Sequence, residues 1–219
     1  MPVRAAKPVA ARTADTKAAL IEGAIEALRE DGFAGASARV IARRAGCNQA
    51  LIFYHFGSVP DLLVAALEQV STRRMEAYRG LLAHTGTIGG LVDAARTIFA
   101  EDLAAGHVTV LVEMIAGARS VPGLGEKVAA RVAPWREFAE TAVRRGLASS
   151  PLARLLPAED VAHAVVAGFL GLEQLANLDG NRAAALSLFD RAAALALLAD
   201  MAGALPWDAR PGDQSGGSR

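Results

Sequence analysis

The sequence predicts an all-α protein, with a small unit of three helices at the N-terminus and a larger helical domain after it. Apolar residues make up 53% of the 219 positions and aromatic residues only 5%, and alanine and leucine are the main apolar types. Alanine and leucine head the helix-propensity scale, so this composition favours helices over strands. The chain shows no strand-like alternation and no fixed-period repeat.

The first expected helix covers residues 16–31. Its apolar residues, among them Leu20 and Leu28, recur at helical spacing, and the charged residues lie off that stripe. Gly32 is expected to end the helix in the left-handed conformation, with Phe33 against Leu28 as in a Schellman cap.

Two short helices follow almost without a gap. Ser37 is the expected N-cap of a helix that stops at Gly46, and Asn48 is the expected N-cap of a helix that runs to Phe56. Residues 45–47 between them give the spacing of a helix-turn-helix.

The remainder predicts six longer helices, because joints that contain glycine or proline separate most of the apolar segments. The tail after residue 206 is polar and rich in glycine, which indicates disorder. The expected helices cover about 59–82, 89–105, 107–119, 124–148, 158–178 and 181–203.

One face of the third helix is suited to the major groove of DNA. Ile52 and Phe56 share the face that we expect in the core, which leaves the opposite face free. The major groove admits one α-helix, and side chains such as glutamine contact base edges there while others bind phosphates. Gln49 is the expected base-contacting residue. The candidate DNA-binding residues are Ser37, Arg39, Arg43, Arg44, Asn48, Gln49, Ala50, Leu51, Phe53, Tyr54 and His55.

Simpler roles stay open for some of these residues. Phe53 and Tyr54 could pack against the next helix, and His55 could interact with the last carbonyls of its own helix. Cys47 is expected to be a small buried apolar residue, because the sequence places no second cysteine and no basic partner beside it.

The motif in this region resembles the DNA-binding domain of the TetR/AcrR family. The resemblance rests on Ser37, Ile41-Ala42 and Ala45-Gly46, followed by the run Tyr-His-Phe-Gly-Ser at 54–58, and it covers about residues 13–65. It implies nine or ten helices, a three-helix DNA-binding unit, a larger ligand-binding domain, and a dimer formed through the last two long helices.

Two positions depart from the family pattern. Val59 stands where such proteins usually carry a lysine that often contacts a phosphate, and Phe53 stands where tyrosine is usual. These departures concern DNA affinity and not the fold.

The larger domain offers two sets of candidates by the same resemblance. The first set, the candidate pocket residues, would ordinarily be interpreted as core packing. The second set, the candidate dimer-interface residues, includes small residues that allow helices to approach closely. The candidate effector-pocket residues are Phe99, Leu103, Met114, Trp135, Phe138 and Phe169. The candidate dimer-interface residues are Ala164, Ala167, Gly168, Gly171, Leu175, Phe189, Ala193 and Leu197.

The charge distribution favours a polyanionic partner, and the motif content argues against a metalloprotein and an enzyme. The formal net charge is zero, yet residues 1–57 carry +3 and residues 58–219 carry −3. The positive charge of the N-terminal part suits binding to a polyanion. No spacing of His, Asp or Glu predicts a metal site, and no phosphate loop, serine elbow or Cys–His pair predicts an enzyme. We therefore expect no cofactor, and, without a membrane span or secretory signal, a cytoplasmic protein.

The expected domains are a disordered basic arm at 1–12, a DNA-binding domain at 13–58, an effector-binding and dimerisation domain at 59–205, and a disordered tail at 206–219. The leading hypothesis is a homodimeric repressor that leaves double-stranded operator DNA when a small molecule binds. In one alternative the C-terminal half only dimerises or binds a protein partner. In another, less favoured, the protein is a helical ligand carrier or an enzyme.

Overall fold

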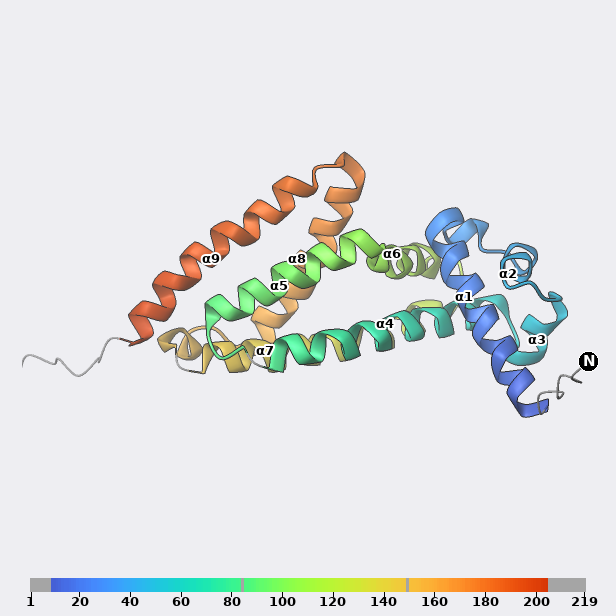
Figure 1. The fold of residues 1–219 in the computed structure, drawn as a ribbon, viewed down its shortest axis with the longest axis horizontal. Coiled ribbons are helices and arrows are strands. Elements are labelled where there is room, and N and C mark those ends of the chain that lie inside the picture. The colour runs from blue at the N-terminus through green and yellow to red at the C-terminus, as the bar shows by residue number, and fades with distance from the viewer. Residues whose placement is uncertain (1–8, 84, 149, 205–219) are drawn as a thin grey trace, which may run out of the picture.

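The computed structural model describes residues 9–83, 85–148 and 150–204, and these residues form nine α-helices and one short 3-10 turn at Pro151–Arg154. No strand occurs among them, which confirms the predicted all-α class. The molecule is elongated, with α1, α2 and α3 at one end and the C-terminus of α9 at the other (Figure 1). The helices are α1 (Val9–Gly35), α2 (Ala38–Arg44), α3 (Ala50–Phe56), α4 (Val59–Ala83), α5 (Ile88–Ala105), α6 (His107–Ala118), α7 (Leu124–Leu147), α8 (Ala158–Asp179) and α9 (Arg182–Ala204).

The last six helices begin and end within one residue of the predicted bounds. Glycines account for several of these ends. Gly106, Gly123 and Gly180 have φ angles of 64°, 75° and 70°, in the left-handed region that L side chains avoid. A helix cannot continue through such a residue, so the sequence marks these boundaries directly.

The first helix differs from its prediction at both ends. It starts at Val9 instead of residue 16, because residues 9–15 are rich in alanine and contain neither glycine nor proline. Gly32, with φ 71° and ψ 180°, breaks the helix, and residues 33–35 form a last turn beyond the kink. The expected Schellman cap is replaced by a tertiary hydrogen bond, in which the Phe33 N–H donates to Glu113 Oε2 on α6 at 2.8 Å.

The predicted arm and tail lie mostly outside the described residues, which begin at residue 9 and end at residue 204. The part of the arm that is described, residues 9–12, belongs to α1.

The core divides into one large cluster near the end formed by α1, α2 and α3 and two smaller clusters further along the molecule. The large cluster joins the three N-terminal helices to α4, α6 and α7, and its fully buried residues include Leu28, Ile41, Ile52 and Met114. The smaller clusters contain most of the aromatic side chains of the larger domain. The N-terminal unit is therefore packed directly on the larger domain.

The last helix is tied to the start of α5. The carboxylate of Asp200 accepts hydrogen bonds from the N–H groups of Ile88 and Gly89, at 3.0 and 2.9 Å. These N–H groups belong to the first turn of α5, which has no intrahelical acceptors for them and favours a negative charge. Asp200 thus holds α9 along α5.

Candidate nucleic-acid interface and interior polar cluster

A tight turn positions α2 and α3. The Ser37 hydroxyl accepts a hydrogen bond from the Val40 N–H, which confirms Ser37 as the N-cap of α2. Gly46 has a φ of 66°, and the Cys47 N–H donates to the Ala42 carbonyl at 3.0 Å, so the chain reverses within a few residues. A Cβ at Gly23 of α1 would lie 2.9 Å from the Ile41 carbonyl oxygen, so only glycine lets α1 approach α2 this closely.

The third helix buries one face and exposes the other. Ile52 is fully buried, whereas Phe53 is 52% and Tyr54 is 80% exposed. Gln49 and Ala50 are also exposed, on the same side as Phe53 and Tyr54. Large aromatic side chains are seldom left this exposed unless a partner covers them.

The other residues of the predicted face are arranged differently. Asn48 Oδ1 accepts from the Ala50 N–H at 2.8 Å, but the N-cap of α3 is Gln49 and not Asn48 as predicted, and the Gln49 side chain makes no capping hydrogen bond. Leu51 is half-buried and packs against the large core cluster. His55 is half-buried, with its ring centroid 4.8 Å from that of Tyr54.

The three arginines of α2 divide into two kinds. Arg39 and Arg43 are exposed. Arg44 is bound by Glu30 and Asp31 of α1, at 2.7 Å each, and these hydrogen bonds raise its pKa. Because its charge is already matched, we leave Arg44 out of the proposed DNA interface.

The start of α4 follows from residues 58–61. The Ser58 hydroxyl accepts from the Asp61 N–H at 3.2 Å and donates to the Asp61 carboxylate at 2.6 Å, a reciprocal cap of the helix N-terminus. That carboxylate also binds Lys127 of α7 at 2.5 Å, and the Lys127 hydrogen bond is the main reason why the pKa of Asp61 is lowered. Val59 is half-buried against the large core cluster.

The six predicted pocket residues do not form one group. Phe99, Leu103 and Phe169 pack together, with ring centroids of Phe99 and Phe169 5.2 Å apart. Trp135 and Phe138 lie in the neighbouring cluster, which Phe169 also contacts. Met114 is fully buried in the large cluster near α1, α2 and α3, so it packs apart from the other five.

Beside these aromatic residues lies a cluster of buried polar side chains that the sequence analysis did not find. We call the set Arg74, Tyr78, Asp102, His107 and Glu173 the interior polar cluster. Arg74 forms an ion pair with Asp102, which is fully buried, and the Tyr78 hydroxyl donates to the same carboxylate at 2.7 Å. His107 Nδ1 lies 3.1 Å from Asp102 Oδ1, and burial is the main cause that lowers the pKa of His107 to about 4.

Glu173 is the exception in this cluster, because its carboxylate has no hydrogen-bond partner. Its side chain is 1% exposed, and both carboxylate oxygens lack a hydrogen-bond partner. Burial raises its pKa to about 7, although the positive charge of Arg74 partly opposes the shift. The guanidinium of Arg74 in turn stacks on Trp135, with 4.8 Å between its central carbon and the ring centroid.

Spacing along single helices could have indicated the polar cluster. Arg74 and Tyr78 are four residues apart on α4, Glu173 follows Phe169 by four residues on α8, and Asp102 falls between Phe99 and Leu103 on α5. Each is a polar residue on an apolar face, which is unusual without a buried partner.

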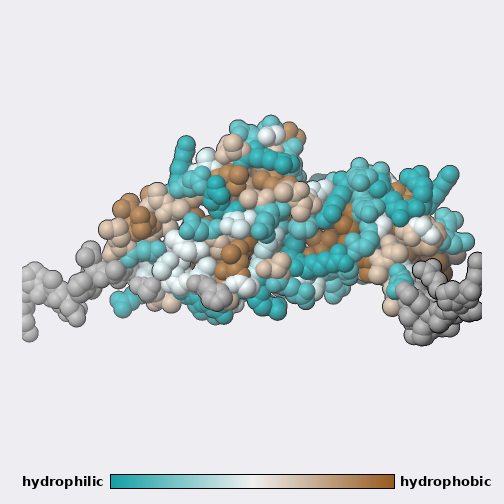
Figure 2. All heavy atoms as spheres, in the orientation of Figure 1, coloured by the Kyte–Doolittle hydropathy of each residue, from teal (hydrophilic) through white to brown (hydrophobic). Residues whose placement is uncertain are grey.

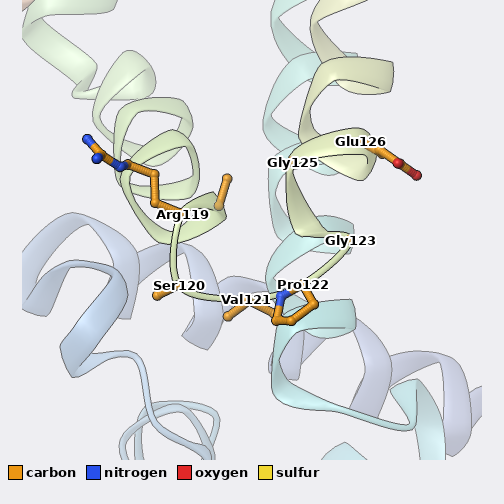
Figure 3. Close-up of a pocket in the computed structure, with 8 residues that line it drawn as sticks. Arg119, Ser120, Val121, Pro122, Gly123, Gly125 and Glu126 are labelled. Carbon is orange, nitrogen blue, oxygen red and sulfur yellow. The ribbon is translucent and has the colours of Figure 1, made fainter.

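Two surface hollows lie away from this cluster. One, of about 360 Å³, is formed by the loop between α6 and α7, where Arg119 and Glu126 point away from each other (Figure 3). The other, of about 370 Å³, is lined by residues of α7, of the segment before α8 and of the first turn of α8, including Arg144 and Glu159. Neither is lined by a member of the interior polar cluster.

The predicted dimer-interface residues fall mostly on exposed faces of α8 and α9. On α8, Ala164, Ala167, Gly168, Gly171 and Leu175 are all exposed and form one stripe, opposite the face that carries Glu173. On α9, Leu197 is 61% exposed and Ala193 is half-buried. Phe189 instead packs inside the protomer, 5.1 Å from Phe99 between ring centroids, because it lies on the face of α9 that covers α5. Apolar residues gather along α9 in Figure 2.

Among the described residues, α8 is the one unbroken helix that is long and apolar enough to cross a membrane. Core helices of soluble proteins meet the same criterion, so this is weak evidence for a membrane span.

Helix α6 connects the interior polar cluster with α1 of the N-terminal unit. At its start His107 contacts Asp102, and further along Glu113 accepts the Phe33 N–H. At Gly117 a Cβ would lie 2.3 Å from the Phe33 ring, so α1 and α6 can meet only because residue 117 has no side chain. A shift of α6 would therefore displace α1 directly.

Two short helices joined by a tight turn, with an exposed face on the second, define a helix-turn-helix unit. The sequence of residues 20–66 matches the family model for bacterial regulatory proteins of the tetR family. Uncharacterised HTH-type transcriptional regulators from Mycobacterium bovis and Mycobacterium tuberculosis are 32% identical to this chain over 115 residues. The match covers 52% of this chain and 59% of the length of these relatives. Over residues 20–66 the chain is therefore similar to the DNA-binding part of tetR-family regulators.

Solved structures share the fold over most of the chain. FadR from Bacillus subtilis, solved in complex with stearoyl-CoA, has a TM-score of 0.68 at 14% identity over 81% of this chain and 96% of its own. The regulatory protein TetR from Rhodobacter sphaeroides has a TM-score of 0.68 at 18% identity, with the same coverage. At these identities the likeness concerns the fold alone.

Proposed function

We propose that this protein is a cytoplasmic transcriptional repressor that binds double-stranded operator DNA as a homodimer and releases it when a small molecule binds. The observation that carries this proposal is the exposed face of α3 and its N-cap, where Gln49, Ala50, Phe53 and Tyr54 are exposed to solvent while Ile52 is fully buried. In a groove, Gln49 would contact base edges, and Tyr54 and the exposed Arg39 and Arg43 would bind phosphates. The match of residues 20–66 to the tetR family model favours regulation over catalysis.

The homodimer is supported by the apolar surface of α8 and α9. Leu175 is 58%, Leu178 85%, Leu195 69% and Leu198 63% exposed. A Cβ at Gly168 or Gly171 would meet no atom within 4 Å, so the stripe leaves room for a second helix. Contiguous apolar surface of this kind usually marks an interface, and a twofold pairing would cover it on both chains.

Release by a small molecule is supported by the unpartnered polar groups inside the larger domain and by the fold shared with FadR, whose structure holds stearoyl-CoA. The location of both surface hollows away from this cluster favours the alternative, in which the larger domain only dimerises or binds a protein.

The test is an electrophoretic shift of DNA from upstream of the protein's own gene, with sedimentation of the free protein. We expect a dimer that binds a near-palindromic site with half-site centres about 34–36 Å apart. A stable monomer that binds the same DNA with undiminished affinity would refute the dimeric mode. No shift at any salt concentration, with a folded protein, would refute DNA binding.

A further inference from the structure

We propose that the interior polar cluster binds an organic monocation, a protonated amine on an apolar body, and that Glu173 is the group that recognises its charge. This inference rests on the proposed effector response and names the chemical class of the effector.

The first step is the unequal distribution of partners within the cluster. Asp102 interacts with Arg74, Tyr78 and His107, whereas neither oxygen of Glu173 has a partner. A carboxylate buried without a hydrogen-bond partner raises the free energy of the folded protein, because it has lost its hydration, and the charge of Arg74 offsets this loss only in part. A ligand that donates hydrogen bonds to Glu173 would remove this penalty, so the site favours donors.

The second step is the charge balance. The cluster holds one cation, Arg74, and that cation is already paired with Asp102. His107 is neutral near neutral pH, since its pKa is lowered to about 4. With Glu173 ionised the cluster therefore carries one excess negative charge, which a monocation neutralises and an anion would increase.

The third step excludes a metal ion as the cation. Metal sites in proteins need several ligands, and no group of three or more His, Cys, Asp or Glu within the described residues is placed to supply them. An ammonium group needs only hydrogen-bond acceptors, and Glu173 offers two unused oxygens.

The fourth step gives the rest of the ligand. Phe169, four residues before Glu173, lies with its ring centroid 5.2 Å from Phe99 and 6.1 Å from Phe189. Trp135 on α7 already stacks on a cation, Arg74. Aromatic faces attract cations and accept apolar bodies, so the surroundings of Glu173 suit an amine that carries an aryl or alkyl group. Because Glu173 is 1% exposed, the ligand must part the helices around it to enter.

The experiment measures binding without DNA. The purified full-length protein is titrated in a calorimeter at about pH 8 with 4-phenylbutylamine, with the neutral 4-phenylbutan-1-ol and with the anionic 4-phenylbutanoate. We expect the amine to bind more tightly than the alcohol and the carboxylate to bind weakest. Glu173→Gln, which keeps the shape and removes the charge, should weaken the amine about tenfold or more and change the alcohol less than about twofold.

A matched control and a second measurement keep the result interpretable. Glu137→Gln changes an exposed carboxylate on α7 and should leave all three affinities unchanged. In the unmodified protein, amine affinity should fall between about pH 8 and pH 6 as Glu173 takes up a proton, whereas alcohol affinity should not.

Three results would overturn the inference: no amine binding to the unmodified protein, equal amine affinity in the Glu173→Gln variant, or preference for the carboxylate. A DNA shift measured separately on the same proteins distinguishes the two proposals. DNA binding without amine binding would refute the proposed monocation effector but not the proposed DNA-binding function. Absence of DNA binding by the unmodified protein would refute the proposed DNA-binding function.

Discussion

Replacing Glu173 with glutamine should make the folded protein more stable, and the gain should grow as pH rises. Burial raises the pKa of Glu173 from 4.5 to about 7, so the folded state holds its proton more tightly than the unfolded state does. Stability from this group is complete below about pH 4.5 and is lost as pH rises toward about 7, where the folded protein must bury an unpartnered charge.

The size of the effect follows from the shift. At 1.36 kcal/mol for each pKa unit, the penalty above pH 7 is roughly 3 kcal/mol, and most of it accrues between about pH 5 and pH 8. His107 opposes this trend, because its lowered pKa costs stability as pH falls from 6.5 toward 4. His107 is present in both proteins, so the difference between them isolates Glu173.

Urea unfolding at several pH values measures this difference. We expect the Glu173→Gln variant to gain about 2–3 kcal/mol over the unmodified protein between about pH 5 and pH 8. The exposed control Glu137→Gln should give a difference that does not change with pH. A Glu173→Gln difference that is equally flat, or that favours the unmodified protein at high pH, would refute the assignment of Glu173 as a buried, unpaired carboxylate.

Three further changes test other parts of the structure. Gln49→Ala should abolish the preference at one operator base pair at a cost of about 1–3 kcal/mol, whereas Arg39→Ala should weaken all DNA sequences alike, as measured by binding to a set of operator variants. Val59→Lys should lower the melting temperature and leave the slope of log K against log salt unchanged, because Val59 is half-buried against the core. Gly117→Ala should destabilise the protein by about 1–3 kcal/mol in urea unfolding, because the new methyl group would overlap the ring of Phe33.

Each of these three predictions has an outcome that would contradict it. Unchanged base preferences in Gln49→Ala would show that another residue contacts the bases. A salt slope steeper by about 0.9 in Val59→Lys would place that position beside a phosphate. For Gly117→Ala the matched control is Gly125→Ala, at an exposed site in α7 with an ordinary 3.9 Å contact to Ala118, which should be neutral or stabilising. Equal stability of the two variants would show that the contact of α1 with α6 is not tight.

The sequence predicts where most helices begin and end, but it does not predict which helices pack against each other. The joints at Gly106, Gly123 and Gly180 are local signals, since a positive φ stops a helix whatever surrounds it. Which face of a helix is buried is also indicated by local spacing in the sequence, and for this reason Ile52 could be assigned to the core. Spacing does not tell which neighbour a buried face meets, so Met114 could be placed inside but not in the correct cluster.

The interior polar cluster was beyond the reach of local patterns. Its members lie on four helices, and Arg74 and Glu173 are far apart in the sequence. No spacing rule relates them, because the fold alone brings them together. Arg44 shows the same limit on a smaller scale: its position in α2 indicated a DNA contact, and its ion pairs with α1 become visible only in the structure.

The contact of α1 with α6 depends on two residues that lack a side chain and on one backbone hydrogen bond. Gly32 and Gly117 leave the space, and Glu113 binds the Phe33 N–H. None of these groups belongs to the interior polar cluster, and none lies on the exposed face of α3. Substitutions that alter what the larger domain recognises can therefore accumulate without disturbing this junction. A mutational library for new effector specificity should accordingly vary α4, α5, α7 and α8 and hold residues 32, 33, 113 and 117 constant.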